Sequence, residues 1–281
     1  MGHGRAGLKR GGKALAHAFF RLFVHHVRDM KIAVPPQSAA PPFTMAFQPI
    51  VDAGCGEVFA YEALVRGTQG QGALHILSSV GESERFGFDQ QCRLAAIRLA
   101  SRLGLADSGT AALSINFLPN AVREPSACTE ATLAAASQLA FPADRIILEF
   151  TEGEAIEDHV HLGRIIDAYR RLGFRTAIDD FGSGYSGLTL LAKFQPDIIK
   201  LDMELVRGVD ADRVRRTIVG SIQRMCEDLG IVLVAEGIET QGEYQALRDL
   251  GVDLLQGFLF ARPQVEALPA PAWPAGVMGR A

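Results

Sequence analysis

Short apolar strands alternate with amphipathic helices along most of this chain, and that alternation constrains its fold more than any other feature. Strands that are separated by helices pair in parallel through crossover connections, which defines an α/β protein. The strands that we predict are 46–52, 57–65, 111–117, 145–150, 174–180, 197–201, 231–236 and 252–258. The helices that we predict are 88–104, 129–139, 157–172, 211–229 and 240–250. Eight strands over about 220 residues suit a TIM-like (β/α)8 barrel better than an open sheet.

The first two predicted strands are the exception to this parallel pattern. Only the four residues 53–56, of which two are glycine, separate them. A connection this short joins antiparallel neighbours, so we expect the first strand to run against the others.

The two ends of the chain differ in composition from the alternating region. Residues 33–44 contain four prolines, which block both helix and sheet. We therefore predict that residues 1–44 form an extension made of a basic, partly helical segment and a Pro-rich linker. Residues 45–267 are expected to form one domain, and the Ala-, Pro- and Gly-rich residues 268–281 a disordered tail.

The extension is strongly basic, unlike the rest of the chain. Residues 1–44 contain seven Lys or Arg and one acid, Asp29. Residues 13–32 combine this charge with apolar side chains at helical spacing, which predicts contact with a membrane surface or a protein partner. The other interpretation, an artefact of an upstream start codon, stays open.

Bulk composition excludes several classes of protein. The formal net charge is −4, so we expect no DNA or RNA partner. The four cysteines are far apart and form no CxxC pair, which favours the reducing cytoplasm. No run of 18 apolar residues occurs, and Arg21 interrupts the one segment that resembles a secretory signal. The predicted location is the cytoplasm, with membrane association only through the N-terminal helix.

Polar residues recur at the carboxyl ends of the predicted strands. In a parallel barrel these ends converge on one face, where active sites lie. One such acid is readily explained as a helix cap or a surface residue, but a repeated pattern is not. The residues are Glu62, Asn116, Glu149, Asp179, Asp180, Lys200, Glu236 and Gln256.

Five carboxylates around one barrel mouth would repel one another unless cations neutralise them. Carboxylate and amide oxygens suit Mg²⁺ or Mn²⁺ better than zinc. The neighbouring acids Asp179 and Asp180 can bridge two metals, an arrangement that clamps both reacting oxygens of a phosphodiester. Lys200 either balances charge or orients water and phosphate.

With these residues in place, the chain resembles the EAL family of cyclic di-GMP phosphodiesterases over residues 46–266. The resemblance implies a TIM-like barrel with an antiparallel first strand. It rests on many motifs in order, each at a strand end. The motifs are Gln48-Pro49-Ile50, Glu62-Ala63-Leu64 followed by Arg66, Asn116, Glu149 to Glu152, Asp179 to Tyr185, Lys200-Leu201-Asp202, Ala235 to Glu239 and Gln256-Gly257.

The resemblance also implies a role for each matching residue. One Mg²⁺ or Mn²⁺ ion would be bound by Glu62, Asn116, Glu149 and Asp179. A second would be bound by Asp179, Asp180 and Glu236. The residues implied in catalysis are Glu236, Lys200 and Asp180. The residues implied in substrate contact are Gln48, Arg66, Gln256 and Asp202. Those implied in stabilising loops are Glu152 and Glu239.

The implied reaction is in-line attack of water on phosphorus, which opens one ring ester of cyclic di-GMP and gives linear pGpG. The loop after Asp180 implies a homodimer, because that loop couples the dimer contact to the metals in this family. The chain departs from the family in the Gly-rich segment after Arg66 and in Gly187-Leu188, where a second serine is common. Neither departure removes a metal ligand.

Three other functions fit parts of the sequence less well. The match of Gly182, Gly184 and Gly187 to a dinucleotide fingerprint is discounted, because Asp179 and Asp180 beside it would repel a pyrophosphate. A glycosidase barrel uses paired carboxylates but has no use for Asn116 and Lys200. A domain that binds cyclic di-GMP without hydrolysing it is the main alternative, although no metal ligand is lost here.

Overall fold

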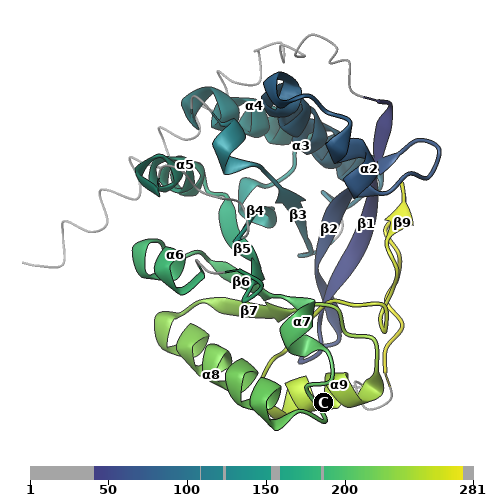
Figure 1. The fold of residues 1–281 in the computed structure, drawn as a ribbon. Coiled ribbons are helices and arrows are strands. Elements are labelled where there is room, and N and C mark those ends of the chain that lie inside the picture. The colour runs from purple at the N-terminus through teal and green to yellow at the C-terminus, as the bar shows by residue number, and fades with distance from the viewer. Residues whose placement is uncertain (1–40, 108, 123–124, 153–158, 185–186, 275–281) are drawn as a thin grey trace, which may run out of the picture.

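A computed structural model of the protein describes residues 41–107, 109–122, 125–152, 159–184 and 187–274. These residues form a closed barrel with helices around it (Figure 1). Its strands are β1 (Phe43–Asp52), β2 (Glu57–Gly67), β3 (Ala112–Asn116), β4 (Ile146–Thr151), β5 (Arg175–Phe181), β6 (Ile198–Leu201), β7 (Val232–Ala235), β8 (Leu254–Leu255) and β9 (Gln264–Val265). Its helices are α2 (Ala73–Ser78), α3 (Arg85–Arg102), α4 (Pro125–Gln138), α5 (His159–Arg171), α6 (Gly187–Lys193), α7 (Met203–Val206), α8 (Arg213–Leu229) and α9 (Gln241–Asp249).

Strands β2 to β8 pair in sequence order and in parallel. Strand β1 closes the barrel between β8 and β2 and runs antiparallel to both. The predicted TIM-like (β/α)8 barrel with an antiparallel first strand is therefore confirmed.

The turn between β1 and β2 explains the reversed first strand. Gly56 has a φ of 77°, a conformation that glycine adopts without steric cost, and its amide donates to the Asp52 carbonyl at 2.8 Å. The Asp52 carboxylate accepts from the amides of Gly54 and Cys55 at 2.8 and 3.2 Å. This side-chain turn holds two neighbouring strands in the hairpin that the sequence predicts.

Two apolar layers make up the core. The outer layer lies between the strands and the helices and includes Leu148, Phe150 and Tyr169. The inner layer fills the barrel itself with one small or branched side chain from each strand of the barrel. Its members are Ile50, Ala60, Ala112, Ile147, Ala177, Ile198, Val234 and Leu254. Because successive strand residues point to opposite faces, this layer fixes which side chains can point into the barrel mouth.

Several local expectations differ from the structure. Helices α2, α6 and α7 and strand β9 lie where we predicted no element. They are short, at 6, 7, 4 and 2 residues, so they carry no periodic pattern that a sequence can reveal. The last barrel strand, expected over 252–258, is reduced to Leu254–Leu255.

The boundaries of the expected domain also shift. Strand β1 begins at Phe43, two residues before the expected start at Met45, and Phe43 pairs with Gly67. The expected disordered tail is packed in its first part. The hydroxyl of buried Tyr61 donates to the Pro269 carbonyl at 3.2 Å, and the Ala272 amide donates to the Phe260 carbonyl at 2.8 Å. A buried hydroxyl requires an acceptor, and this segment supplies it.

The helix expected over residues 13–31 lies outside the described residues. Within the part that the structure describes, no helix is both long enough and apolar enough to cross a membrane.

The position of β1 leads to a prediction about the N-terminal extension. A chain that begins at Pro41 should have the same free energy of unfolding as the full chain. A chain that begins at Met45 should be less stable by about 1 kcal/mol or more, because it loses an edge-to-face contact of Phe43 with Phe88 at 5.0 Å. It also loses the hydrogen bond from Thr44 to Glu266 at 2.6 Å. Urea unfolding of the three chains measures their free energies of unfolding. A chain from Pro41 that is less stable than the full chain would contradict this prediction.

Candidate active site

Each strand of the barrel carries a polar residue two positions from its residue in the inner apolar layer. Along β4, for example, Ile147 belongs to the inner layer and Glu149 follows it on the same face. On the antiparallel β1 the order reverses, and Gln48 comes two residues before Ile50. Because side chains alternate along each strand, these polar residues form one ring inside the barrel, next to the inner apolar layer. Its members are Gln48, Glu62, Ser114, Glu149, Asp179, Lys200, Glu236 and Gln256.

Lys200 lies at the centre of this ring. Its side chain is 1% exposed, and its ammonium contacts four carboxylates. Its distances are 3.2 Å to Glu62, 3.1 Å to Glu149, 3.0 Å to Asp179 and 2.6 Å to Glu236. Four carboxylates from four strands can share this space because one buried cation attracts them all.

Neutral side chains also donate hydrogen bonds to two of these carboxylates, Glu62 and Glu149. Asn116 and Gln256 donate to the two oxygens of Glu62 at 3.2 and 2.8 Å. The Ser114 hydroxyl donates to Glu149. Gln256 also contacts Gln48 at 3.2 Å. These bonds hold Glu62 and Glu149 at fixed positions in the floor of the site.

The carboxylates form two groups that share one member. Oxygens of Glu62, Glu149 and Asp179 lie within 4.8 Å of one another, and so do oxygens of Asp179, Asp180 and Glu236. Asp180 has a φ of 53°, a strained conformation for a residue with a side chain. Strain of this kind persists where the surrounding structure imposes it, and here it accompanies the irregularity in the pairing of β5 with β6 between Ile178 and Phe181.

Burial and crowding raise the pKa of most of these carboxyls. The pKa of Glu149 is raised to about 8 by burial and by Glu62 and Asp179, which Lys200 only partly offsets. Burial also raises the pKa of Asp179 and Glu236, with neighbouring carboxylates adding to it. Burial and the charges of Asp179 and Asp202 raise the pKa of Asp180 to about 6. The cluster therefore contains more carboxyl groups than one lysine can keep ionised, so some of them bind protons near neutral pH.

Two other members of the cluster are shifted toward their charged forms. Burial alone would raise the pKa of Glu62, but Lys200 and the donors Gln256 and Asn116 outweigh it, so its pKa is lowered. Burial would lower the pKa of Lys200, but the surrounding carboxylates raise it well above its ordinary value. Lys200 is a permanent cation in this site, so it does not act as a proton donor near neutral pH.

This donor set fits divalent metal ions. Both groups offer hard oxygen ligands, and they share Asp179 as a bridge. Burial, and then mutual repulsion, raise the pKa values of the clustered carboxyls, and cations that bind there would favour their ionised forms. Glu62, Asn116, Glu149 and Asp179 would hold one ion, and Asp179, Asp180 and Glu236 the other.

Glu152 anchors the loop that follows Asp180. Its carboxylate accepts from the amides of Gly182 at 2.8 Å and Gly187 at 2.6 Å. A Cβ at Gly187 would collide with the side chains of Glu152 and Phe181, so a residue larger than glycine does not fit there. The loop-stabilising role of Glu152 stays a prediction, and Tyr185 and Ser186 of this loop lie outside the described residues.

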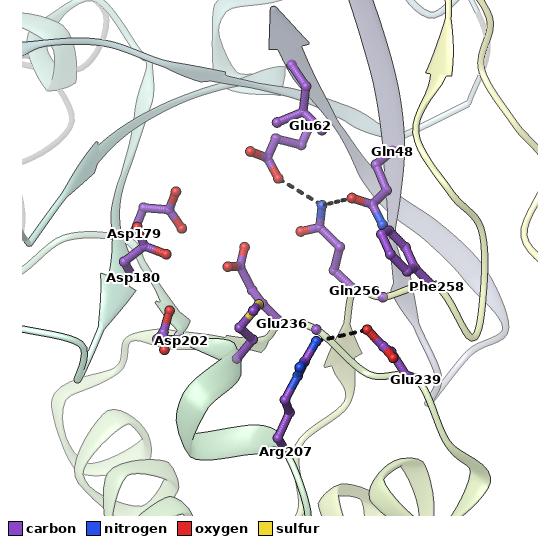
Figure 2. Close-up of a pocket in the computed structure, with 14 residues that line it drawn as sticks. Gln48, Glu62, Asp179, Asp180, Asp202, Arg207, Glu236, Glu239, Gln256 and Phe258 are labelled. Atoms are coloured by element: carbon purple, nitrogen blue, oxygen red, sulfur yellow. Dashed lines mark hydrogen bonds and ion pairs between the residues drawn. The ribbon is translucent and has the colours of Figure 1, made fainter. Parts of the chain in front are cut away.

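A cavity of about 380 Å³ opens above the carboxylate ring (Figure 2). Two hydrophobic residues, Met203 and Phe258, form part of its wall and are 42% and 45% exposed. Its lining consists of Gln48, Glu62, Leu64, Asp179, Asp180, Asp202, Met203, Arg207, Glu236, Gly237, Glu239, Gln256, Gly257 and Phe258.

The structure places three of the predicted residues differently from the rest of the site. Arg66 does not line this cavity, and its guanidinium donates to the adjacent Val65 carbonyl at 2.8 Å. Asp202 lines the cavity, but its carboxylate also caps α7 by accepting from the Glu204 amide at 2.8 Å. Glu239 lies at the cavity rim, where its side chain pairs with Arg207 at 3.0 Å.

Three residues contribute to the site without having been predicted: Glu243, Arg207 and Phe258. Glu243, rather than Glu239, holds the loop after β7, because it accepts from the amides of Glu239 and Thr240 at 3.0 and 3.1 Å. The motif of Thr240 followed by Glu243 is a capping box, so the sequence contained that signal. Arg207 and Phe258 follow elements of four and two residues, and nothing in the sequence pattern marks them.

The pKa shifts predict that metal binding releases protons. At pH 6.5 Glu149 is mostly protonated in the metal-free protein and Asp180 is protonated in a minor fraction of molecules, whereas metal ions require the carboxylate form. Affinity for Mn²⁺ should therefore increase from pH 6 to pH 8, with net proton release at pH 6.5. Calorimetric titration of Mn²⁺ in buffers of different ionisation enthalpy measures the number of protons that are released per bound ion. Binding without proton release would contradict the assigned shifts.

The fold and the site together define an acidic centre at the mouth of an α/β barrel, with carboxylates grouped as metal ligands are. A family model described as "EAL domain" matches residues 33–263. The chain therefore belongs to the EAL domain family, and the predicted resemblance is confirmed.

Known relatives vary in their described activities. The chain is 34% identical over 230 residues to the blue light- and temperature-regulated antirepressor BluF of Escherichia coli, covering 82% of this chain and 56% of BluF. It is 39% identical over 137 residues to the probable cyclic di-GMP phosphodiesterase PdeD of E. coli, covering 49% of this chain and 25% of PdeD. The chain thus spans about half or less of the length of these curated relatives.

Two solved structures are close in shape. A standalone versatile EAL protein from Vibrio cholerae O395, in its c-di-GMP-bound form, is 50% identical with a TM-score of 0.80, covering 84% of this chain and 98% of that one. The manganese and cyclic di-GMP complex of Klebsiella pneumoniae BlrP1 is 38% identical with a TM-score of 0.74, covering 83% of this chain and 58% of that one.

Proposed function

We propose that this chain is a metal-dependent phosphodiesterase that hydrolyses cyclic di-GMP to linear pGpG in second-messenger signalling. The observation that carries the proposal is the pair of carboxylate groups that share Asp179. A shared carboxylate holds two cations close together, which is the arrangement suited to displacement at a phosphodiester. The names of PdeD and of the solved cyclic di-GMP complexes support the choice of substrate.

The metals that we propose are Mg²⁺ or Mn²⁺, two per site, which suit oxygen ligands. When bound, they would neutralise the phosphate and lower the pKa of the attacking water. Manganese in the BlrP1 complex supports this choice.

The protein's own side chains then hold the reacting groups and accept the proton. Water attacks phosphorus and gives up a proton, the bond from phosphorus to the ring 3′ oxygen breaks, and the leaving oxygen takes a proton from solvent. Glu236 and Asp180 are the proposed proton acceptors, because they line the cavity and their pKa values are raised from the ordinary carboxyl range. Lys200 is proposed to orient water and phosphate from the floor of the site, and Gln48 and Gln256 to contact the substrate.

The direct test is a turnover assay with purified protein. Cyclic di-GMP should be converted to pGpG with Mg²⁺ or Mn²⁺, and conversion should stop with EDTA. Ca²⁺ should support binding but little turnover, since its longer and looser coordination misplaces the reacting groups. Turnover that persists after thorough chelation would reject the metal-dependent mechanism.

We also propose a homodimer. The support is the loop that Glu152 anchors beside Asp180, which is the part of the site that the family resemblance associates with dimer contacts. Light scattering should give twice the mass of the chain. A fully active preparation that contains only monomer would overturn this proposal.

The N-terminal segment 13–32 stays a prediction. We propose that its basic amphipathic pattern contacts an anionic membrane surface or a protein partner. Sedimentation with anionic liposomes tests the membrane contact, and failure of the full chain to sediment would remove it.

A further inference from the structure

Arg207 is the one cation among the described residues that line the active-site cavity. Lys200 lies beneath the cavity with its ammonium already in contact with four carboxylates. Arg66 does not line the cavity. The acids that do line it are Glu62, Asp179, Asp180, Asp202, Glu236 and Glu239. If a ligand places a second negatively charged group in the cavity, outside the two carboxylate groups, Arg207 is the cation that can bind that group.

The backbone of Arg207 is held firmly while its side chain reaches solvent. Its amide donates to the Met203 carbonyl at 2.9 Å at the end of α7, and its carbonyl accepts from Arg215. The side chain is 53% exposed. Figure 2 shows the guanidinium extending from α7 along the cavity rim, with Glu239 as its partner.

The partner of Arg207 is easily exchanged. Glu239 is 46% exposed, so its ion pair with Arg207 at 3.0 Å is screened by water. The loop of Glu239 is fixed independently, because Glu243 holds its amide at 3.0 Å. Breaking the Arg207–Glu239 pair therefore disturbs neither backbone, and a stronger anionic acceptor can replace the Glu239 carboxylate.

The substrate supplies such an acceptor. A cyclic dinucleotide carries two phosphodiester anions, and the carboxylate groups with their metals engage the one that is hydrolysed. We propose that Arg207 binds the other phosphate, the one that stays intact, and releases Glu239 as it does so. The guanidinium keeps its positive charge at all relevant pH values, and its N–H groups donate charge-assisted hydrogen bonds to phosphate oxygens. This inference rests on the proposed function and assigns a substrate-binding residue that no motif contains.

The test compares Arg207→Gln and Arg207→Lys with Arg213→Gln, a matched loss of an exposed arginine on α8 outside the cavity. Arg207→Gln should raise KM for cyclic di-GMP roughly tenfold or more, the usual effect of losing a charge-assisted hydrogen bond. Its kcat should change less than about threefold, since the reacting phosphate is held elsewhere. Arg207→Lys should recover most of the loss, because it keeps the positive charge. Arg213→Gln should resemble the unmodified protein.

Two further measurements separate this role from others. Bis(4-nitrophenyl) phosphate has a single phosphate, so its kcat/KM should not change in Arg207→Gln. Calorimetric binding of cyclic di-GMP with Ca²⁺ should weaken by the same factor as KM. The protein could bind the dinucleotide and fail to hydrolyse it, which would reject the proposed function but not the role of Arg207. The calorimetric measurement would still test Arg207 in that case.

The proposal is overturned if Arg207→Gln leaves both KM and the binding constant for cyclic di-GMP unchanged. It is also overturned if Arg207→Gln lowers kcat/KM for the single-phosphate ester by the same factor as for cyclic di-GMP. It is also overturned if Arg207→Lys binds as weakly as Arg207→Gln. That result would place Arg207 on a guanine edge, where the arginine fork rather than its charge is required.

Discussion

Replacing Glu236 by glutamine is expected to slow cyclic di-GMP hydrolysis by about 10²–10⁴-fold while binding of the dinucleotide survives. Glu236 follows β7 directly, and its amide donates to the Leu201 carbonyl at 3.2 Å, so its position is fixed by the barrel. The amide side chain keeps the shape of glutamate, but it cannot accept a proton and is a weaker metal ligand. Gln48, Gln256 and the first carboxylate group remain to hold the substrate.

The measurement pairs kinetics with calorimetric binding of cyclic di-GMP in the presence of metal. Glu130→Gln, a change at an exposed position on α4, is the matched control and should keep normal activity. A near-normal rate in Glu236→Gln would show that Glu236 belongs to neither the second metal group nor the proton transfer. Loss of both rate and binding would show that Glu236 mainly holds the substrate or the fold.

Replacing Lys200 by methionine is expected to lower the free energy of unfolding of the metal-free protein by about 3–5 kcal/mol at pH 8. The change keeps a long side chain and removes the cation that four carboxylates share at 2.6 to 3.2 Å. The pKa values of Glu149, Asp179 and Glu236 are already raised and should rise further. The loss should therefore be smaller at pH 6, where the carboxyls take up protons instead of repelling one another.

Urea unfolding at pH 6 and pH 8, with and without Mn²⁺, tests this expectation. Mn²⁺ should restore part of the stability of Lys200→Met, because metal ions supply the missing positive charge. The control is Lys193→Met at an exposed position of α6, which should change stability by less than about 0.5 kcal/mol. A loss below about 1 kcal/mol at pH 8 would show that the carboxylates do not depend on Lys200.

Much of the fold and site follows from one regularity in the sequence. A buried strand has an alternating pattern, and a polar residue two positions beyond an inward apolar residue must also point inward. Ile147 with Glu149, and Ile198 with Lys200, illustrate this, and the barrel brings such pairs together. The antiparallel β1 was equally predictable, because the turn of residues 53–56 is too short for a crossover.

The parts that sequence analysis missed depend on contacts between distant segments. The packing of residues 268–274 reflects the need of the buried Tyr61 hydroxyl for an acceptor, which no local pattern reports. The placement of Arg207 at the cavity rim depends on a helix of four residues whose N-cap is Asp202. Arg66 lies on β2 within a recognised motif, yet it does not line the cavity, and a motif does not specify the contact that its guanidinium makes with the Val65 carbonyl.

The most direct test of the central claim follows the fate of the substrate in ¹⁸O-labelled water. Protein loaded with Mn²⁺ and mixed with excess cyclic di-GMP should give pGpG that contains one ¹⁸O in its new terminal phosphate. No labelled product should form after EDTA treatment. Cyclic di-GMP that binds the metal-loaded protein, as shown by calorimetry on the same sample, and is recovered intact and unlabelled would contradict hydrolysis. That result would identify the chain as a domain that binds the dinucleotide without cleaving it.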